Sequence, residues 1–217
     1  HQGSHPRMGA VDVIPFVPIS GCTMEDCVAL ARQVGEALGN MGVPVFLYEE
    51  AATRPERRNL ADVRRGEFEG LREQIGVDPA KEPDFGPARI HPTAGCTAVG
   101  ARMPLIAFNL NLGTSDLSIA RRIARAVRGS SGGLVHCKAI AVPLADRNQV
   151  QVSMNMVNFK ETPLHRAFEL IRLEAERYGV PVVGSEIVGL VPIDALVGVV
   201  RHYLRLEGFK SDQVLEK

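Results

Sequence analysis

The sequence has no excess of either charge. Lys plus Arg and Asp plus Glu each number 25 among the 217 residues, so the formal net charge is zero at pH 7. No basic block offers a track for a phosphate backbone, which argues against nucleic acid as a partner. The apolar runs, such as residues 11–19 and 182–193, are interrupted by proline, glycine or charge well short of the ~20 residues that a membrane helix needs. We therefore expect neither nucleic-acid binding nor a membrane span.

Cysteine is scarce, and its spacing excludes the usual redox and zinc motifs. The four cysteines are Cys22, Cys27, Cys96 and Cys137, and they form no C-x-x-C pair. The first residues show no charged-then-apolar signal pattern. We expect reduced, mostly buried thiols and a cytoplasmic protein. The composition is 45% hydrophobic, which is enough to bury a substantial core.

The first half of the chain alternates between predicted strands and helices. Residues 11–19 have a strand pattern, and Thr23 with Asp26 forms a capping box that starts an amphipathic helix ended by Gly42. A short buried strand at 44–49 precedes the charged stretch 52–76, which predicts one or two surface helices whose arginines are mostly solvated. Residues 77–100 are rich in proline and glycine and lack periodicity, which predicts a long ordered loop or a domain boundary.

The second half of the sequence predicts four strands and three helices. Its strands are expected at 104–112, 134–144, 149–159 and, as a buried strand, 181–192, with helices at 115–128, 163–178 and 193–206. In the third strand, valine and methionine alternate with polar residues, so one face packs on a core and the other carries polar groups. The order β-α-β-β-α-β-α favours a split βαβ, ferredoxin-like arrangement. The fold class is therefore α/β (α+β), in two lobes that meet near the 77–103 loop, each a mixed β-sheet with helices on its outer face.

The opening segment, HQGSHPRMGA, contains two histidines four residues apart. This spacing suits two metal ligands on one helical face, but Gly3 and Pro6 argue against a helix. A single histidine, with an ordinary pKa of ~6.5, both takes and gives a proton near neutral pH. Pro6 favours an extended backbone at His5, and Gly9 permits a tight turn or a close approach to a ligand. The residues alone leave three interpretations open: a catalytic His5, a zinc pair with His1, or a histidine in an ordinary turn.

A series of motifs resembles one family along the whole chain. The motifs, in order, are HPRMGAVDVIPFVPI, TMEDCVALA, PVFLYEEAA, PDFGP, GAR, LIAFNLNL, QVSMN and PVVGSEIVGLVP. Together they resemble the glutamate formiminotransferases, folate enzymes of histidine breakdown. The resemblance implies that residues 1–102 are the remainder of the family's N-terminal subdomain, including a folate loop, and that 103–217 are its C-terminal subdomain. Family members begin several dozen residues earlier, so part of the first lobe is expected to be missing, and no room is expected for the cyclodeaminase domain of two-domain members.

The resemblance also implies a reaction. The formimino carbon of N-formimino-L-glutamate passes to N5 of tetrahydrofolate through a tetrahedral intermediate, and glutamate leaves. The histidine of the family's HPR motif corresponds to His5, which is the implied general base and acid. Tetrahydrofolate is the implied co-substrate, no metal is required, and the implied assembly is a homodimer. The absence of a metal requirement weakens the zinc interpretation of His1 and His5.

Further site residues follow from the same resemblance. The family's folate-binding loop corresponds to Gly86, Pro87, Ala88, Arg89, Ile90, His91, Pro92, Thr93, Ala94 and Gly95, and an ordinary interlobe linker is the alternative. The sequence departs from the animal enzymes at two places. Ala94, in this loop, replaces an aromatic residue, and Ser4, beside His5, replaces an acid.

Candidates for binding carboxylates and lining the groove are fewer. Arg7 and Arg102 are tentative partners of substrate carboxylates, because a guanidinium matches a carboxylate bidentately, and surface ion pairs are the alternative. Asn155 and Gln151 lie on the polar strand face, where they either line a groove or bond to each other.

Three other functions remain as alternatives. A relative that transfers formimino from glycine, or formyl in place of formimino, would use the same histidine with a different pocket. A non-catalytic folate-binding or assembly protein belongs to another class, which substrate turnover would exclude. A metal-dependent hydrolase is the weakest alternative, and metal analysis of the purified protein would test it.

Overall fold

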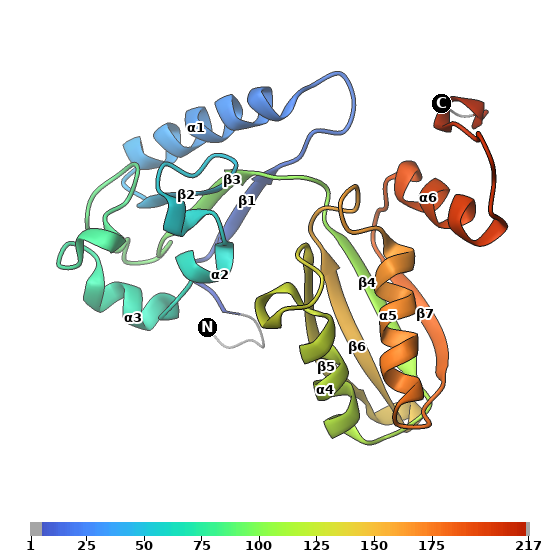
Figure 1. Cartoon of the computed structure of the whole chain (residues 1–217). Coiled ribbons are helices and arrows are strands. Elements are labelled where there is room, and N and C mark those ends of the chain that lie inside the picture. Colours follow the sequence, from blue (N-terminus) through green and yellow to red (C-terminus); the bar gives the residue numbers. More distant parts are fainter. Residues whose placement is uncertain (1–5, 216–217) are drawn as a thin grey trace. The chain divides into compact units, whose positions relative to one another are not determined.

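The computed structural model describes residues 6–215 and contains two compact α/β units, His1–Met103 and Pro104–Lys217. Each unit has its own β-sheet and its own covering helices (Figure 1). The expected α/β fold class is therefore confirmed. The described strands pair only in parallel in the first sheet and only antiparallel in the second, which is a more uniform pairing than the mixed sheets expected.

The first sheet has three parallel strands in the order β1-β3-β2. They are β1 (Val13–Phe16), β2 (Val45–Glu49) and β3 (Thr97–Ala101). The central strand, β3, lies in the segment expected to be a loop, so that prediction was wrong over 97–100. Its sequence, TAVGA, is buried along its whole length and built of small residues, so it lacks the alternation that marks a half-exposed strand. A Cβ on Gly100 would lie 2.5 Å from the Tyr48 ring, so the close fit of two strands explains the small side chains.

Helices cover both faces of this sheet. Helix α1 (Met24–Asn40), started by the predicted capping box of Thr23 and Asp26, packs on one face. Helices α2 (Leu60–Val63) and α3 (Glu67–Gln74) pack on the other and account for the two surface helices expected in the charged stretch. Each face carries its own apolar cluster, as expected for a parallel sheet between two layers.

One arginine of the charged stretch is an exception to the expected solvated face. Arg57 is 3% exposed and pairs with Asp84 at 2.5 Å, and its guanidinium lies over the ring of Phe46. Asp84 also accepts a hydrogen bond from the backbone N–H of Leu47 at 2.8 Å. This buried pair attaches the segment before the glycine-rich loop to strand β2, a contact that the local pattern of charges does not reveal.

The second sheet has four antiparallel strands in the order β5-β6-β4-β7. The strands are β4 (Ile106–Leu112), β5 (Cys137–Leu144), β6 (Gln149–Met156) and β7 (Val182–Val188). The helices are α4 (Leu117–Val127), α5 (Leu164–Glu176) and α6 (Ile193–Leu204). Strand β6 lies between β4 and β5, which flank α4 in the sequence, so the predicted split βαβ order is confirmed.

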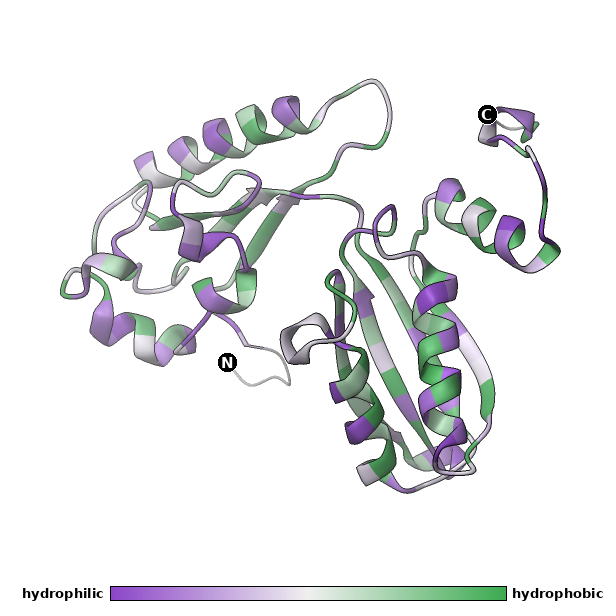
Figure 2. Cartoon of the chain, viewed as in Figure 1, coloured by the Kyte–Doolittle hydropathy of each residue, from purple (hydrophilic) through white to green (hydrophobic). Residues whose placement is uncertain are grey.

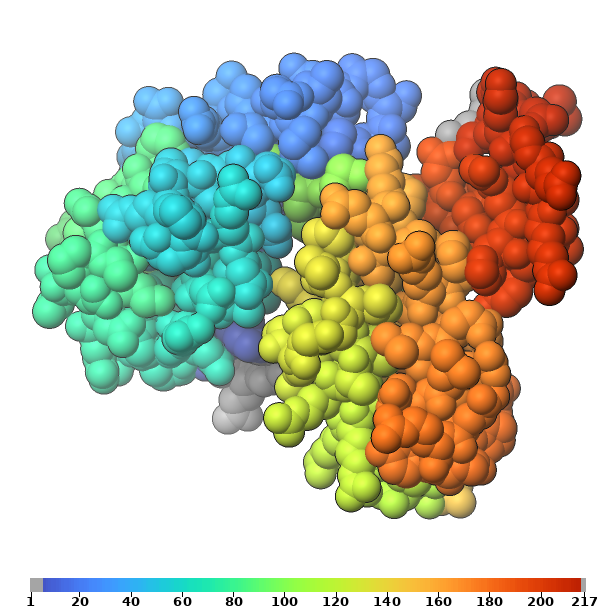
Figure 3. All heavy atoms as spheres, viewed as in Figure 1, coloured from blue at the N-terminus to red at the C-terminus, as the bar shows by residue number. Residues whose placement is uncertain are grey.

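Helices α4 and α5 cover one face of the second sheet (Figures 1 and 3). The predicted alternation of β6 is confirmed, because Val150, Val152, Met154 and Met156 are buried there. In Figure 2 β6 and β7 carry white and purple residues among the green ones, and the helices carry both purple and green residues, as expected for amphipathic helices on a sheet with one apolar and one polar face. The opposite face of the sheet carries the polar side chains of β4, β6 and β7.

Strand β7 differs from its prediction. It was expected to be buried, yet Val183 and Val188 are 50% and 56% exposed. The reason is its place in the sheet, since β7 is an edge strand that pairs only with β4. A hydrophobic run alone does not distinguish a central strand from an edge strand.

The cysteines behave as predicted. All four are free, Cys22 is exposed, and the other three are buried. Burial raises the pKa of both Cys96 and Cys137 to about 12, so these two thiols stay protonated and unreactive at neutral pH. No helix within residues 6–215 is long and apolar enough to cross a membrane.

Candidate functional site

The first unit contains a cavity of about 370 Å³ whose walls come from three separate segments. Its lining residues are Arg7, Gly9 and Ala10, then Phe68 and Glu69 of α3, then Pro92, Thr93, Ala94 and Gly95. The volume lies within the range of roughly 300–1,000 Å³ that is typical of small-molecule pockets. The fold therefore brings the chain that follows His5 to the same cavity as the end of the predicted folate loop, residues 86–95 (called the glycine-rich loop), about 85 residues later in the sequence.

Direct backbone pairing joins the two segments. The N–H of Ala10 donates to the carbonyl of Ala94 at 2.9 Å, and the N–H of Cys96 donates to the carbonyl of Met8 at 3.0 Å. These bonds flank an antiparallel bridge between Gly9 and Gly95. The candidate site is thus built on a small backbone ladder, which holds both segments without using side chains.

Both glycines of this bridge are required by its geometry. A Cβ on Gly9 would lie 2.2 Å from the carbonyl oxygen of Cys96. Gly95 has a φ of +72°, and a Cβ there would lie 2.5 Å from the carbonyl oxygen of Met8. No real Cβ approaches backbone atoms so closely, and positive φ adds strain for other residues. The bridge closes only because neither residue has a side chain.

The turn at the end of the loop is closed by His91. Its Nδ1 accepts hydrogen bonds from the backbone N–H groups of Thr93 at 3.3 Å and Ala94 at 3.0 Å. The backbones of His91 and Gly95 are also joined by two hydrogen bonds. The imidazole is therefore committed to shaping the turn through Nδ1, and residues 92–95 face the cavity in a pre-formed conformation.

Two glutamates match the charge of Arg7 at the cavity wall. The guanidinium donates to Glu67 at 2.7 Å and to both oxygens of Glu69, at 2.6 and 3.1 Å. The hydrogen bonds from Arg7 hold the pKa of Glu69 below its usual value, so the carboxylate stays ionised. Arg7 thus fixes Glu69 in the wall of the cavity, in addition to its own place there.

Residues 6–12 are held by further contacts with the first unit. The N–H of Met8 donates to Asp12 at 2.6 Å, and Asp12 also pairs with the guanidinium of Arg64. The side chain of Met8 is 1% exposed in the core beneath α3. His5 itself lies outside the described residues, which begin at Pro6.

The first half of the predicted folate loop lies outside the lining of this cavity. Gly86 has a φ of +85°, and a Cβ there would lie 2.5 Å from the carbonyl oxygen of Val43, so it permits close packing against the turn after α1. Ile90 packs against the core of the first unit. Pro87, Ala88 and Arg89 lie between them and are not among the described residues that line the cavity. Only residues 92–95 of the predicted 86–95 therefore face it.

The comparisons with known proteins cover both units. A family profile described as "Formiminotransferase domain, N-terminal subdomain" matches residues 1–102, and one described as "Formiminotransferase domain" matches residues 107–215. The chain belongs to the formiminotransferase family. The resemblance inferred from the motifs is therefore confirmed.

Relatives of this family match the chain from end to end. A glutamate formimidoyltransferase of Streptococcus pyogenes serotype M1 is 56% identical over 218 residues, which cover 100% of this chain and 73% of the relative. A glutamate formimidoyltransferase of Thermoplasma acidophilum is 51% identical over 220 residues, with 100% and 72% covered. A formimidoyltransferase-cyclodeaminase of Dictyostelium discoideum is 44% identical over 223 residues, which cover 100% of this chain and 41% of the relative.

The two remaining tentative residues lie elsewhere. Arg102 follows β3 and donates from Nη1 to the carbonyl of Met103 at 3.0 Å, outside the lining of the cavity described above. Asn155 is exposed on β6, in the second unit, on the same face as Gln151. Of the two alternatives for Gln151 and Asn155, the bond between them is not formed in the described residues, because Gln151 donates to Asn111 and to Glu186, both at 2.8 Å.

This polar face contains residues that the sequence interpretation missed. Asn109 and Asn111 lie on β4 and Glu186 on β7, and cross-strand register places them beside Gln151. The signal was present in the alternation of IAFNLNL, where the two asparagines occupy every second position and share one face of the strand.

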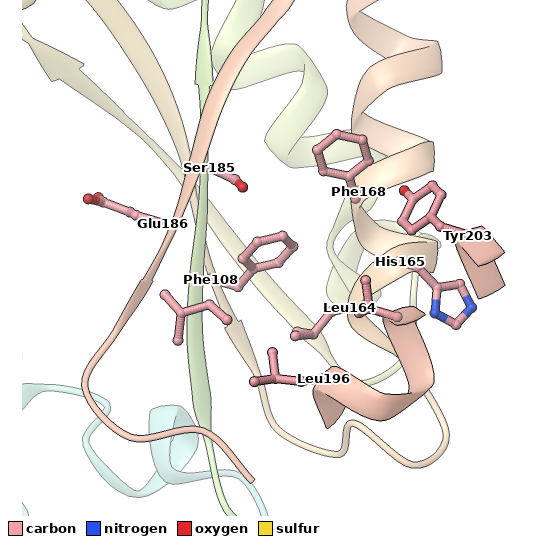
Figure 4. A pocket seen from close by; sticks show the side chains of 10 residues that line it. Phe108, Leu164, His165, Phe168, Ser185, Glu186, Leu196 and Tyr203 are labelled. Atoms are coloured by element: carbon pink, nitrogen blue, oxygen red, sulfur yellow. The ribbon is translucent and has the colours of Figure 1, made fainter. Parts of the chain in front are cut away.

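A second cavity, of about 610 Å³, lies in the second unit between β4, α5 and α6 (Figure 4). Apolar and aromatic side chains such as Phe108, Phe168 and Tyr203 converge on it. At its edge the ring of His165 stacks on that of His202, with centroids 4.1 Å apart. The hydroxyl of Tyr203 donates to Glu169 at 2.8 Å. These contacts join α6 to α5.

Within residues 6–215, no three His, Cys, Asp or Glu side chains are grouped as a metal site would require. The part of the candidate site that is described offers instead a carboxylate, a paired guanidinium and backbone groups around a small cavity. Such a set suits the binding of a polar organic ligand, with proton transfer by a nearby titratable side chain.

Proposed function

We propose that the protein transfers the formimino group of N-formimino-L-glutamate to N5 of tetrahydrofolate, giving 5-formiminotetrahydrofolate and L-glutamate. The observation that carries this proposal is the match of both units to the formiminotransferase family, with relatives named glutamate formimidoyltransferase that cover the whole chain. Tetrahydrofolate acts as a co-substrate and is consumed in each turnover.

The reaction needs one group that exchanges a proton twice. N5 attacks the formimino carbon, the tetrahedral intermediate forms, and the bond from that carbon to the glutamate nitrogen breaks. N5 loses a proton and the glutamate nitrogen gains one, so a single histidine can serve as base and then as acid. We assign this role to His5. Support comes from Arg7 and Gly9, its near neighbours in the chain, which line the cavity.

The cavity would receive part of the folate. In this proposal, residues 92–95 form one wall, with the turn closed by His91, while residues 86–90 hold the loop on the core. Glu69 and Arg7 form a polar part of the wall. Arg7 and Arg102 both stay tentative partners of a substrate carboxylate, because the charge of Arg7 is already matched by Glu67 and Glu69 and Arg102 lies outside the lining of this cavity.

The wider expectations from the sequence are kept as part of the proposal. A neutral chain with buried thiols fits a cytoplasmic enzyme of small substrates, with neither nucleic acid nor a membrane as partner. The proposed assembly is a homodimer, and no metal takes part in the proposed reaction.

A steady-state assay with two donors tests the proposal. The purified protein is given tetrahydrofolate with N-formimino-L-glutamate or with N-formiminoglycine, and 5-formiminotetrahydrofolate is measured. We expect turnover with the glutamate donor, and a loss of about 10²- to 10⁴-fold in kcat for His5→Ala, as is typical of a removed general acid/base. His136→Ala is the matched control, since His136 pairs with Glu161 in the second unit, and its kcat should equal that of the unchanged protein.

Each of the other outcomes contradicts part of this proposal. Preference for the glycine donor would change the substrate. Transfer from N-formyl-L-glutamate, giving 5-formyltetrahydrofolate, would change the group transferred. Folate binding without turnover would make the protein a non-catalytic relative. An unchanged kcat in His5→Ala would move the proton transfer to another residue.

A further inference from the structure

The face of the second sheet opposite α4 and α5 holds a hydrogen-bonded carboxylate, Glu186, that has no role in the proposed reaction so far. Three carboxamides surround it: Asn109, Asn111 and Gln151 are 7%, 8% and 6% exposed. Their register across β6, β4 and β7 pairs Asn111 with Gln151, and Asn109 with Glu186. Buried amides in a sheet cost stability unless they are hydrogen-bonded, so a network of this kind needs a reason beyond packing.

The network converges on Glu186. Its Oε1 accepts from Asn109 Nδ2 at 3.1 Å and from Gln151 Nε2 at 2.8 Å. Gln151 is oriented in turn by its bond to Asn111 Oδ1 at 2.8 Å. Asn109 is held through its own Oδ1, which accepts from the backbone N–H of Met154 at 3.4 Å. The amides therefore hold Oε1 of the carboxylate in place.

Glu186 is exposed, although the amides that hold it are buried. Glu186 is among the residues that line the aromatic cavity, and in Figure 4 its side chain points away from Phe108. Within residues 6–215, both of its hydrogen bonds end on Oε1 and none of the ion pairs includes it. Oε2 is thus left to the open face. Hydrogen bonds from Asn109 and Gln151 lower the pKa of Glu186, so this side chain is ionised at neutral pH.

An ionised carboxylate that is held through Oε1 and has Oε2 free suits a planar N–C–N ligand edge, because an N–H group of that edge can donate to Oε2 in a charge-assisted hydrogen bond. Both substrates of the proposed function carry such an edge. The formimino group of the donor is an amidine, which is a cation when protonated and presents N–H groups on both sides of one carbon. The pterin ring presents N3–H beside its 2-amino group, with the same spacing.

We propose that Glu186, positioned by Asn109 and Gln151, binds such an N–C–N edge in one of the two substrates. This proposal rests on the proposed function for the identity of the ligand. It makes Glu186 a specificity-determining residue for that substrate. Arg147, the cation that acts electrostatically on Glu186, stabilises its charge from the loop between β5 and β6.

If the unchanged protein turns over the substrates, the KM values of the Glu186→Gln variant test the proposal. The glutamine keeps the shape and removes the charge. A hydrogen bond to a charged group is worth enough to change KM by about 10- to 100-fold. A rise in KM for formiminoglutamate alone assigns the amidine, and a rise for tetrahydrofolate alone assigns the pterin edge. If neither KM changes, the proposal is wrong.

Two further variants separate binding from folding. Glu176→Gln makes the same chemical change on α5, where Glu176 pairs with Arg172, and both KM values should stay unchanged. Gly184→Ala adds a methyl group on the same face as Glu186; its Cβ would lie 3.8 Å from Asn111 Nδ2, an ordinary contact, so folding is preserved. The same KM that rises in Glu186→Gln should rise in this variant.

A binding measurement keeps the proposal testable if the unchanged protein shows no turnover, which would contradict the proposed function alone. Formamidinium and 2-aminopyrimidin-4-one are titrated separately into ¹⁵N-labelled protein, and the side-chain amide signals of Asn109 and Gln151 are followed. One of the two compounds should shift these signals in the unchanged protein and not in Glu186→Gln. If neither compound shifts them, or if both proteins respond alike, the proposal is refuted.

Discussion

Replacing Gly95 by alanine should weaken both the fold of the first unit and the binding of tetrahydrofolate. The φ of +72° alone costs a residue with a Cβ about 1–2 kcal/mol. The new Cβ would also lie 2.5 Å from the carbonyl oxygen of Met8, and relieving such an overlap costs about 1–3 kcal/mol. The expected loss in the free energy of unfolding is therefore about 2–5 kcal/mol.

Gly42 provides a matched control for the conformational part of this cost. Its φ is +85°, but nothing lies within 4 Å of the position of its Cβ. Gly42→Ala should therefore lose only about 1–2 kcal/mol. Gly9→Ala isolates the steric part of the cost. Its Cβ would lie 2.2 Å from the carbonyl oxygen of Cys96, whereas the φ of Gly9, unlike those of Gly95 and Gly42, is not in the positive range.

Urea unfolding and substrate kinetics measure the two consequences. Gly95→Ala should unfold at lower urea than Gly42→Ala, and its KM for tetrahydrofolate should rise far more than its KM for formiminoglutamate. Gly42→Ala should leave both KM values unchanged, since Gly42 lies outside the cavity lining. Equal stability of Gly95→Ala and Gly42→Ala would refute the argument that the bridge between the two segments requires glycine.

Two further predictions concern buried charge and pH. Asp84→Ala leaves the buried Arg57 without its carboxylate, and urea unfolding should show a loss of about 3–5 kcal/mol in the free energy of unfolding. Glu82→Ala removes an exposed ion pair from the same segment and should cost less than about 1 kcal/mol. Similar losses in the two variants would show that the burial of the pair is unimportant. Desolvation, followed by the nearby charges of His202 and Arg166, lowers the pKa of His165, so the unfolded chain takes up a proton more readily than the folded chain. The thermal midpoint should fall as pH drops below about 6.5, the ordinary histidine value, and His165→Gln should reduce this dependence between pH 7.5 and 5; an unchanged pH profile in the variant would contradict the assignment.

Much of the second unit was accessible from the sequence because its signals are local. The alternation in β6, the Thr-Pro start of α5 and the glycine that ends it each depend on neighbouring residues. The four-stranded order then follows from the rule that a split βαβ inserts a strand between two parallel ones. What failed there was the burial of β7, which depends on its place at the edge of the sheet.

The first unit was less accessible because its key contacts are distant in the sequence. Strand β3 has no alternation, since both of its faces are buried. The burial of Arg57 depends on Asp84, 27 residues later, and no charge pattern in the stretch 52–76 distinguishes this arginine from its exposed neighbours.

The candidate site was predicted in part. Gly9 was noted for a tight turn or a close approach and Gly95 as part of the predicted folate loop, and the structure joins the two in one bridge. The sequence alone did not indicate that His91 would close the turn or that Glu67 and Glu69 would match Arg7, because these contacts depend on how α3 and the loop pack. The carboxylate of Glu186 was missed because its hydrogen bonds come from amides on two other strands.

The most direct test of the proposed function follows the formimino carbon itself. N-formimino-L-glutamate labelled with ¹³C at that carbon is incubated with tetrahydrofolate and the protein, and the reaction is followed by ¹³C NMR. The label should leave glutamate and appear on N5 of the folate, at a rate that His5→Ala lowers by about 10²- to 10⁴-fold. A label that stays on glutamate, or that is released as formamide or formate without reaching the folate, would contradict the account.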